Sequence, residues 1–252
     1  MKRNEFEIEI CANSIESVIE AQNGGADRVE LCESIEVGGT TPSFGLMSLV
    51  KEKSDIDVFA LIRPRGGNFV YTKDEVSIMI RDIRAAISLG VDGVVIGCLL
   101  KNGNVDYDNC SRLIEVAKGL PINFHRAFDV ARNPFEALEV IDSLGITRIL
   151  TSGQENKAFD GVDLLSQLQQ AAPTNLKIMA GSGIDETNIV QIAKKTGITA
   201  FHASLRVEIQ DTHTSNEYKV KFNSTNEIPE NSRKITSANR VRNLIKTLEN
   251  EL

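Results

Sequence analysis

The strongest constraint on the fold is an unbroken alternation of short apolar runs with amphipathic helical stretches along the chain. The apolar runs are bounded by turn residues, as parallel strands covered on both faces usually are. Eight such runs occur, at 6–11, 28–32, 57–63, 93–97, 122–127, 148–152, 176–181 and 199–204. A closed (β/α)8 barrel, or TIM barrel, requires eight units of strand and helix. The sequence therefore predicts an α/β protein built as one such barrel.

The helical stretches between these runs have their own boundary signals. Apolar residues recur at three- and four-residue spacing at 14–22, 74–90, 134–145 and 186–197, among others. An open doubly wound sheet is the rival fold, but it would carry a glycine-rich phosphate loop after its first strand. The segment EICANS at 9–14 is not such a loop. The closed barrel is therefore the favoured architecture.

The 252 residues are predicted to form one domain, 1–252, because no linker interrupts the alternation. Residues 206–236 are polar and show no convincing helical period, so we expect a long irregular loop over the barrel mouth. Loops of that length inside a compact domain are usually functional or mobile. A last helix is expected at 237–251.

Charge and composition exclude several classes of function. The net charge of −7 gives no support for nucleic-acid binding. No run approaches the roughly 20 apolar residues of a membrane helix, and the beginning MKRNEFEIEI lacks the apolar stretch of a signal peptide. The 4 cysteines form no CxxC pair. We therefore expect a cytoplasmic protein with reduced thiols and no membrane partner.

Reactive groups of (β/α)8 barrels lie at the carboxyl ends of the strands. The first two runs end in Glu–x–Cys pairs, Glu9 with Cys11 and Glu30 with Cys32. Alternating strand residues share a face, and consecutive strands of a barrel are neighbours. The two pairs are therefore expected side by side at the barrel mouth.

The acidic residues and His125 allow two interpretations. Glu9 and Glu30 form either a structural ion-pair ring with arginines or an acid–base pair or hard-metal site. His125 lies at the end of the fifth run and near Asp129. This position favours a functional role for the histidine over a structural role in the core. Under the functional interpretation, Glu9, Glu30, His125 and Asp129 are the catalytic candidates.

Several other strand ends carry groups that bind anions. Two arginines in RPRGGNFVY precede a flexible glycine pair, and the turns LTSG and AGSG expose backbone N–H groups that suit a phosphate or carboxylate. Tight-turn geometry alone also accounts for these glycines. The candidate anion-binding residues are Arg63, Arg65, Arg126, Ser152, Gly153, Gly181, Gly183, His202 and Ser204.

The two strand-end thiols are either small buried apolar groups or a pair of ligands for a soft ion. Thiolate sulfur favours Cu(I) over hard cations. No lysine lies at a strand end, which disfavours Schiff-base aldolase chemistry. No motif for an organic cofactor is present, and none is expected.

Seven segments of the chain resemble, in order, the CutC family over about residues 5–205. They are EICANSIESVIEAQNGGADRVELCE, GGTTPS, LIRPRGGNFVY, NFHRAFD, RILTSG, IMAGSGI and FHAS. The resemblance implies a cytosolic (β/α)8 barrel named for copper homeostasis that often forms a homodimer. It also implies Cu(I) binding, with Cys11 and Cys32 at the positions of the family's proposed ligands. Residues beyond about 206 match less clearly, so nothing is transferred to them.

Three functions are therefore expected as alternatives. The first is a cytoplasmic copper homeostasis protein that binds Cu(I) through Cys11 and Cys32. The second is a TIM-barrel lyase, isomerase or hydrolase that acts on a small anionic or phosphorylated substrate by Glu and His acid–base chemistry. In the third, the same acids and histidine hold a hard divalent cation. The expected partner is thus a copper ion or a small anionic molecule, and whether the protein is an enzyme stays open.

Overall fold

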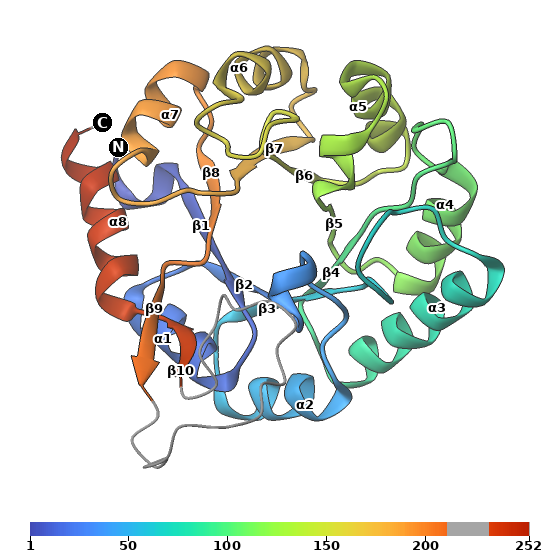
Figure 1. Ribbon diagram of the computed structural model, residues 1–252, viewed down its shortest axis with the longest axis horizontal. Helices are drawn as coiled ribbons and strands as arrows, with labels where there is room; N and C mark the ends of the chain where they lie inside the picture. Colours follow the sequence, from blue (N-terminus) through green and yellow to red (C-terminus); the bar gives the residue numbers. More distant parts are fainter. Residues whose placement is uncertain (211–231, 252) are drawn as a thin grey trace, which may run out of the picture.

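The computed structural model describes residues 1–210 and 232–251, and its parallel strands close into a barrel (Figure 1). Consecutive strands pair from β1 to β8, and β1 pairs with β8 to complete the ring. The strands are β1 (Glu7–Ala12), β2 (Arg28–Leu31), β3 (Asp57–Leu61), β4 (Gly93–Ile96), β5 (Ile122–Phe124), β6 (Arg148–Thr151), β7 (Lys177–Gly181) and β8 (Ala200–Ala203). The predicted (β/α)8 barrel is confirmed.

Helices surround the barrel, as Figure 1 shows. They are α1 (Ile15–Gly24), α2 (Phe44–Lys53), α3 (Lys73–Ser88), α4 (Tyr107–Ala117), α5 (Pro134–Ser143), α6 (Val162–Ala171), α7 (Ile189–Thr196) and α8 (Ala238–Glu251). Local chemistry sets their starts: the Ser14 hydroxyl accepts the Ser17 N–H, and Thr72 and Glu75 form a capping box. None of the helices in the described ranges has both the length and the apolar character to cross a membrane.

The described residues also form three short 3-10 helices, η1 (Arg3–Glu5), η2 (Ile35–Val37) and η3 (Arg126–Val130). The last of them corrects the sequence prediction of a strand over 122–127, because β5 ends at Phe124. His125 caps η3, its Nδ1 accepting the N–H of Ala127 at 3.1 Å. A side chain that accepts a local N–H competes with the strand ladder, so the chain turns here.

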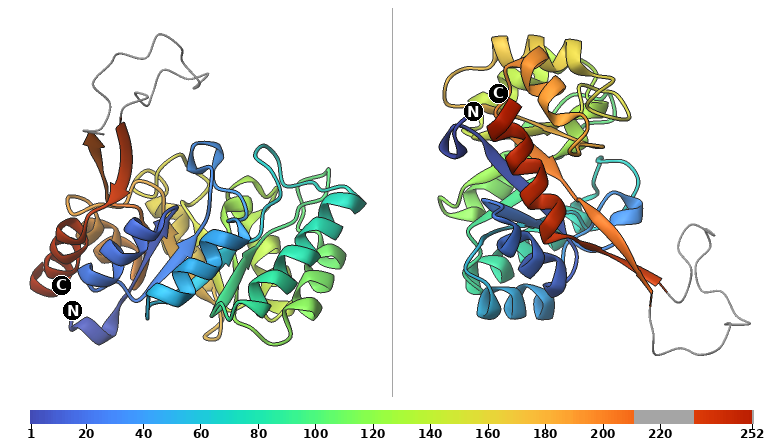
Figure 2. Two further views of the ribbon diagram at one scale, coloured as in Figure 1. Left: turned by 90° about the horizontal axis from the view of Figure 1, so that it is seen from below. Right: turned by 90° about the vertical axis from the view of Figure 1, so that its left-hand side faces the viewer.

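The prediction of an irregular loop at 206–236 is partly wrong. Its described ends form an antiparallel pair of strands, β9 (Arg206–Gln210) and β10 (Ser232–Thr236), while 211–231 lie outside the described residues. The pair extends away from the barrel at its edge (Figure 2). Its base is fixed to α1, because the Thr236 N–H donates to the Ser17 hydroxyl. The alternation in RVEIQ is the period-2 signal of a strand, and the polarity of the segment hides it.

The barrel interior differs from the main core. Most buried apolar side chains lie in one cluster that includes the strands and the helices covering them. Apart from this cluster, the structure has two small apolar clusters, Cys32, Phe59, Leu61 and Val95, and Leu150, Met179 and Ala200. Glu9, Asn123 and His202 are also buried, on strands β1, β5 and β8. Charged groups enclosed in this way must find partners, which places strict demands on their geometry.

An ion cluster closes the amino-terminal end of the barrel. Glu7, the first residue of β1, accepts hydrogen bonds from Arg28, Arg148 and Lys177, which begin β2, β6 and β7. Burial opposes ionisation of Glu7, but these cations outweigh it and lower the pKa of the carboxyl. This end of a (β/α)8 barrel serves stability, so the opposite end is the place to look for function.

Candidate functional site

A pocket of about 310 Å³ opens at the carboxyl ends of the strands. Strands β1, β2 and β8 contribute one wall, and β5 contributes the opposite wall, since it lies four strands away from β1 in the ring. Its polar and charged lining consists of Cys11, Glu30, Cys32, Arg63, His125, Arg126, Ser182, His202, Ser204 and Arg206. The barrel mouth thus gathers most of the strand-end residues that the sequence singles out.

The two strand-end thiols are neighbours. Cys11 lies opposite Glu30 in the β1–β2 ladder, and its Sγ is 3.6 Å from the Sγ of Cys32, which follows β2. Contact with Cys32, and with His202, lowers the pKa of Cys11, although burial opposes this. The same contact raises the pKa of Cys32, and burial adds to the effect. Either sulfur can donate in this contact, and Cys11 is the more readily ionised thiol of the pair.

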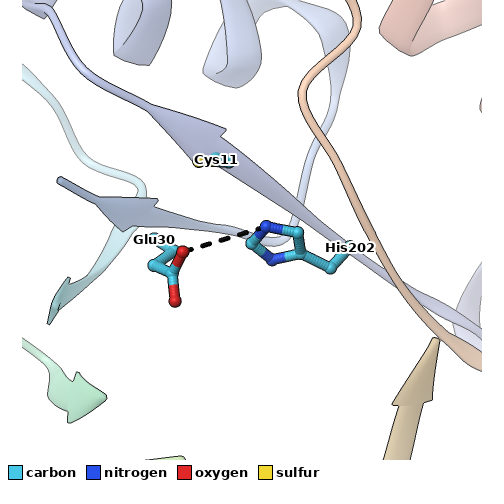
Figure 3. Close-up of side chains that lie close together, drawn as sticks. All are labelled: Cys11, Glu30 and His202. Carbon is cyan, nitrogen blue, oxygen red and sulfur yellow. Dashed lines mark ion pairs between the residues drawn. The ribbon is translucent and has the colours of Figure 1, made fainter. Parts of the chain in front are cut away.

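His202 lies beside Cys11 and Glu30, as Figure 3 shows, and it also contacts Glu9. Its Nδ1 lies 2.8 Å from Glu9 Oε1, and its Nε2 lies 3.8 Å from Glu30 Oε2. Ligand atoms of Cys11, Glu30 and His202 all lie within 4.8 Å of one another. Burial lowers the pKa of His202, but its contacts with Cys11 and the carboxylates outweigh burial and raise it well above the usual value.

The two glutamates have different environments. Glu9 is 1% exposed, does not line the pocket, and accepts a hydrogen bond from Asn123 at 3.4 Å. Burial raises its pKa, but the contact with His202 and the charges of Arg28 and Arg148 together outweigh this, so the net shift is downward. Glu30 lines the pocket, and burial together with the negative charges of Cys11 and Glu9 raises its pKa to about 8. Of the two, only Glu30 can meet a molecule in the pocket.

His125 occupies the wall opposite the thiols. The residue is 5% exposed, and its ring packs on Phe69 with the centroids 5.0 Å apart. Burial, with the charge of Arg63, lowers the pKa of His125 to about 3, so the ring is neutral near pH 7. A Cβ on Gly97 would lie 2.5 Å from His125 Cε1, so this ring position requires glycine at the end of β4.

Arg63 is buried, and its guanidinium holds two loops. Its Nη1 donates to the carbonyls of Val37 and Gly39, at 2.9 and 2.6 Å, and its Nη2 donates to the carbonyl of Gly67 at 2.9 Å. Its partners are backbone carbonyls and the face of Phe69, whose centroid lies 4.9 Å from Cζ. The charge of Arg63 therefore reaches the pocket without a carboxylate beside it in the described part of the chain.

Arg65 does not fulfil the prediction of a second arginine in the site. It lies outside the pocket lining, and its Nε pairs with Glu75 at 2.5 Å. Its other N–H groups donate to the carbonyls of Gly66, Asn68 and Val70. Arg65 therefore braces the loop before α3 instead of binding an anion.

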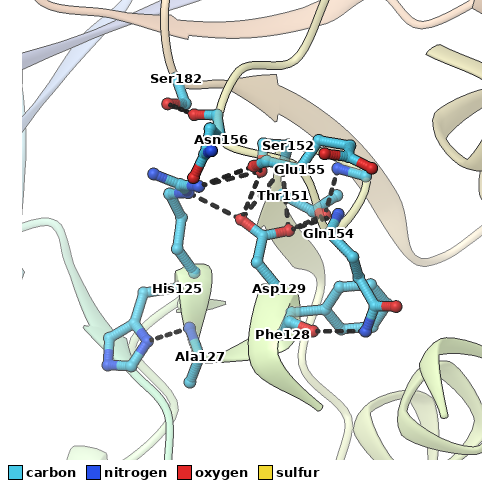
Figure 4. A network of polar contacts seen from close by, with 12 residues as sticks. His125, Ala127, Phe128, Asp129, Thr151, Ser152, Gln154, Glu155, Asn156 and Ser182 are labelled. Carbon is cyan, nitrogen blue, oxygen red and sulfur yellow. Dashed lines mark hydrogen bonds and ion pairs between the residues drawn. The ribbon is translucent and has the colours of Figure 1, made fainter. Parts of the chain in front are cut away.

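Asp129 is likewise outside the pocket, and its carboxylate is fully used by neighbouring groups (Figure 4). It accepts hydrogen bonds from the Thr151 hydroxyl at 2.5 Å and from the N–H groups of Ser152 and Gln154 at 2.9 and 3.2 Å. Arg126 Nε donates to it as well, at 2.7 Å. This network fixes Arg126 at the pocket and leaves Asp129 no contact with the other predicted acid–base residues.

The predicted anion-binding turns have other roles. The anion held by the turn at 152–153 is the protein's own Asp129, and the Gly153 N–H donates to the Thr151 hydroxyl. Gly181 leaves room for its neighbours, since a Cβ there would lie 2.5 Å from Leu150 Cδ1. Of the predicted glycines, only Gly183 lines the pocket.

Comparison with known proteins gives the family. The sequence model of the CutC family matches residues 6–207. A family protein CutC of Bacteroides fragilis is 46% identical over 245 residues, 97% of this chain and 98% of that protein. The chain belongs to the CutC family. The human copper homeostasis protein cutC homolog is another relative, 40% identical over 241 residues, which are 96% of this chain and 88% of that protein.

Solved structures agree with membership of the CutC family. A crystal structure of the copper homeostasis protein CutC from Streptococcus agalactiae matches with a TM-score of 0.76 and 34% identity, over 79% of this chain and 98% of that one. Phosphoribosyl anthranilate isomerase from Thermotoga maritima matches with a TM-score of 0.61 and 10% identity, over 97% of this chain and 98% of that one. The second match shows the TIM-barrel fold alone.

Sequence reasoning missed several parts of this CutC-family pocket. Phe69 lies in the loop between β3 and α3, and Arg206 begins β9, so no rule based on the ends of the barrel strands selects them. The sequence pattern predicts only anion binding for His202, although closure of the barrel between β8 and β1 makes it a neighbour of Glu9. The signal for its central position was therefore available in the predicted topology.

Proposed function

We propose that the protein binds Cu(I) at the barrel mouth through Cys11 and Cys32, as part of copper homeostasis. The observation that carries the proposal is the 3.6 Å separation of the two sulfurs at the edge of an open pocket. Two metal–sulfur bonds of about 2.3 Å place sulfurs roughly 4.0 Å apart at a trigonal centre and 4.6 Å apart at a linear one. The observed separation is closer to the trigonal value and supports a third ligand.

His202 is the candidate for the third position because its ring lies close to Cys11, in a group of ligand atoms that includes Glu30 and not Cys32. Glu9 holds its Nδ1 at 2.8 Å, which directs Nε2 towards Glu30 and Cys11. Carboxylates commonly orient metal-binding histidines from the far ring nitrogen in this way. Two thiol ligands and one imidazole make a soft donor set, which favours Cu(I) over Mg²⁺ or Ca²⁺.

Anaerobic titration with Cu(I) against a competing chelator tests this proposal. The Cys11→Ser/Cys32→Ser double variant should bind Cu(I) more weakly than the wild type by more than about 100-fold, because both soft ligands are lost. His202→Ala should lose less affinity, since the two thiols remain.

Cys98 and Cys110 provide a matched control for the thiol variants. Both are buried, and neither lines the pocket. The Cys98→Ala/Cys110→Ala variant should bind Cu(I) with the affinity of the wild type. Unchanged affinity in the Cys11→Ser/Cys32→Ser variant would overturn the proposal.

A cytoplasmic location and a homodimer remain predictions that accompany this proposal. Reduced thiols suit a reducing compartment. The alternative of an acid–base enzyme gains little from the geometry, because Glu9 and Asp129 do not line the pocket and His125 is neutral. It rests on Glu30 as the one predicted acid that reaches the pocket.

A further inference from the structure

The pocket wall opposite the thiols has features that Cu(I) binding does not use. His125 Nδ1 accepts the N–H of Ala127, so the ring proton is on Nε2. In the described part of the chain, Nε2 has no hydrogen-bond partner and is buried. Figure 4 shows this nitrogen on the side of the ring that faces away from Ala127. Buried donors without a partner are rare in folded proteins, which makes this one a candidate for ligand binding.

Arg63, which follows β3, provides a second buried donor between the thiols and His125. Three of its N–H contacts are taken by backbone carbonyls, while its Nε is buried and has no partner within the described residues. The Arg63 side chain also contacts Tyr71. Arg63 and His125 both pack on Phe69, and the charge of Arg63 acts on His125, so the three side chains form one cluster. Arg63 is 4% exposed, and a buried cation without a counter-charge is costly.

The charges around the pocket favour a negative ligand. Its described lining contains the three arginines Arg63, Arg126 and Arg206 and the single carboxylate Glu30. Asp129 already neutralises Arg126, whereas Arg63 and Arg206 have no carboxylate partner in the described ranges. An anion would supply the missing counter-charge in a partly desolvated site, where charge-assisted hydrogen bonds are strong.

The rest of this wall is apolar. Leu61, Phe69, Leu150 and Ile184 line the pocket beside the charged groups. The volume of about 310 Å³ lies at the lower end of the range for small-molecule sites. The occupant that fits is therefore a small organic molecule with one charged end and an apolar or neutral body.

We infer that the wall formed by Arg63, Phe69 and His125 binds the carboxylate or phosphate group of a small organic anion. The Nε2–H of His125 donates to the oxyanion, the charge of Arg63 balances it, and the organic body lies against the apolar side chains. This inference goes beyond the proposed function and does not depend on it, since it uses neither thiol.

Isothermal titration calorimetry with two probes tests the inference and distinguishes the two anion classes. Hexanoate represents carboxylates and ribose 5-phosphate represents phosphate esters, with hexan-1-ol and ribose as neutral counterparts at matched ionic strength. We expect the wild type to bind at least one anion with a Kd in the millimolar range or tighter. The neutral counterparts should bind at least tenfold more weakly.

Variants at His125 decide the result, because Arg63 also holds two loops and its replacement alters their positions. His125→Phe removes the donor and should weaken binding at least tenfold, while His125→Gln keeps an N–H donor and should retain more affinity. Arg112→Gln, on the outer face of α4, should match the wild type. The Cys11→Ser/Cys32→Ser variant should keep anion binding even where it loses Cu(I).

Three results would overturn the inference. They are no binding of either anion by the wild type at about 10 mM, equal affinity for an anion and its neutral counterpart, and equal affinity in the wild type and His125→Phe. Each of these leaves the Cu(I) titration unaffected, so the two proposals fail separately.

Discussion

Single residues at the barrel mouth owe their properties to what surrounds them. Glu9 and Glu30 lie on adjacent strands, yet the pKa of Glu9 is lowered and that of Glu30 is raised. The difference arises because Glu9 contacts His202 directly and lies near the charges of Arg28 and Arg148. Glu30 is 3.8 Å from the ring and faces the negative charges of Cys11 and Glu9. Two glutamates a few ångströms apart therefore differ in the direction of their pKa shifts.

Glu9 is expected to act on copper through His202. In Glu9→Gln the side chain can still accept a hydrogen bond from Nδ1 but carries no charge, so the imidazole becomes a weaker ligand. We expect Cu(I) affinity to fall by about 10- to 100-fold. The measurement is the anaerobic chelator competition, with the exposed Glu36→Gln as the control that keeps wild-type affinity. Equal affinities in the two variants would contradict the role given to Glu9.

His125 should make the fold sensitive to acid. Burial and Arg63 keep it neutral in the folded state down to about pH 3, whereas the unfolded chain takes up this proton below about pH 6.5. Protonation therefore favours the unfolded state as the pH falls from 6.5 towards 3. Between pH 6.5 and 4.5 this residue should cost the wild type about 2 to 3 kcal/mol of unfolding free energy.

Urea unfolding at the two pH values measures this effect. The loss of unfolding free energy between pH 6.5 and 4.5 should be smaller in His125→Phe than in the wild type, because other titrating groups are common to both. The same loss in both proteins would show that His125 does not remain neutral in the folded state.

At the scale of elements, each strand and its following turn act as one unit that positions a side chain. The unit from β5 to η3 presents His125 and Arg126, and the turn after β6 holds that unit through Asp129. The hairpin of β9 and β10 similarly brings Arg206 to the pocket while its base is fixed to α1. Neighbouring elements therefore determine where the functional groups lie. The packing between these elements is tight.

The contact between α1 and α8 shows how tight this packing is. A Cβ on Gly24 would lie 2.4 Å from Val241 Cβ. Gly24→Ala should therefore destabilise the protein by about 1 to 3 kcal/mol through overpacking. Gly45→Ala in α2 is the matched control, because nothing lies within 4 Å of its added Cβ, and it should stabilise by about 0.5 to 1 kcal/mol. Thermal or urea unfolding measures both, and destabilisation by the two alike would refute the argument.

At the scale of the whole molecule, the repeated pattern predicts the barrel because each of the repeated units carries its own sequence signals for a strand and a helix. It also predicts that Cys11 and Cys32 are close, since consecutive strands pair. It does not predict that Asp129 occupies the turn after β6, because that contact depends on how η3 replaces the end of a strand. Nor does it predict that Nε2 of His125 lacks a hydrogen-bond partner among the described residues, because that depends on the orientation of the side chain.

Closure of the ring between β1 and β8 has a consequence for the order of events in the cell. The thiols come from the first 32 residues, whereas the imidazole that completes the proposed copper site is residue 202. A nascent chain contains both sulfurs long before the ribosome has added His202. Full-affinity copper loading would then have to wait until synthesis is nearly complete, so that an unfinished polypeptide holds the ion less firmly than the mature protein does.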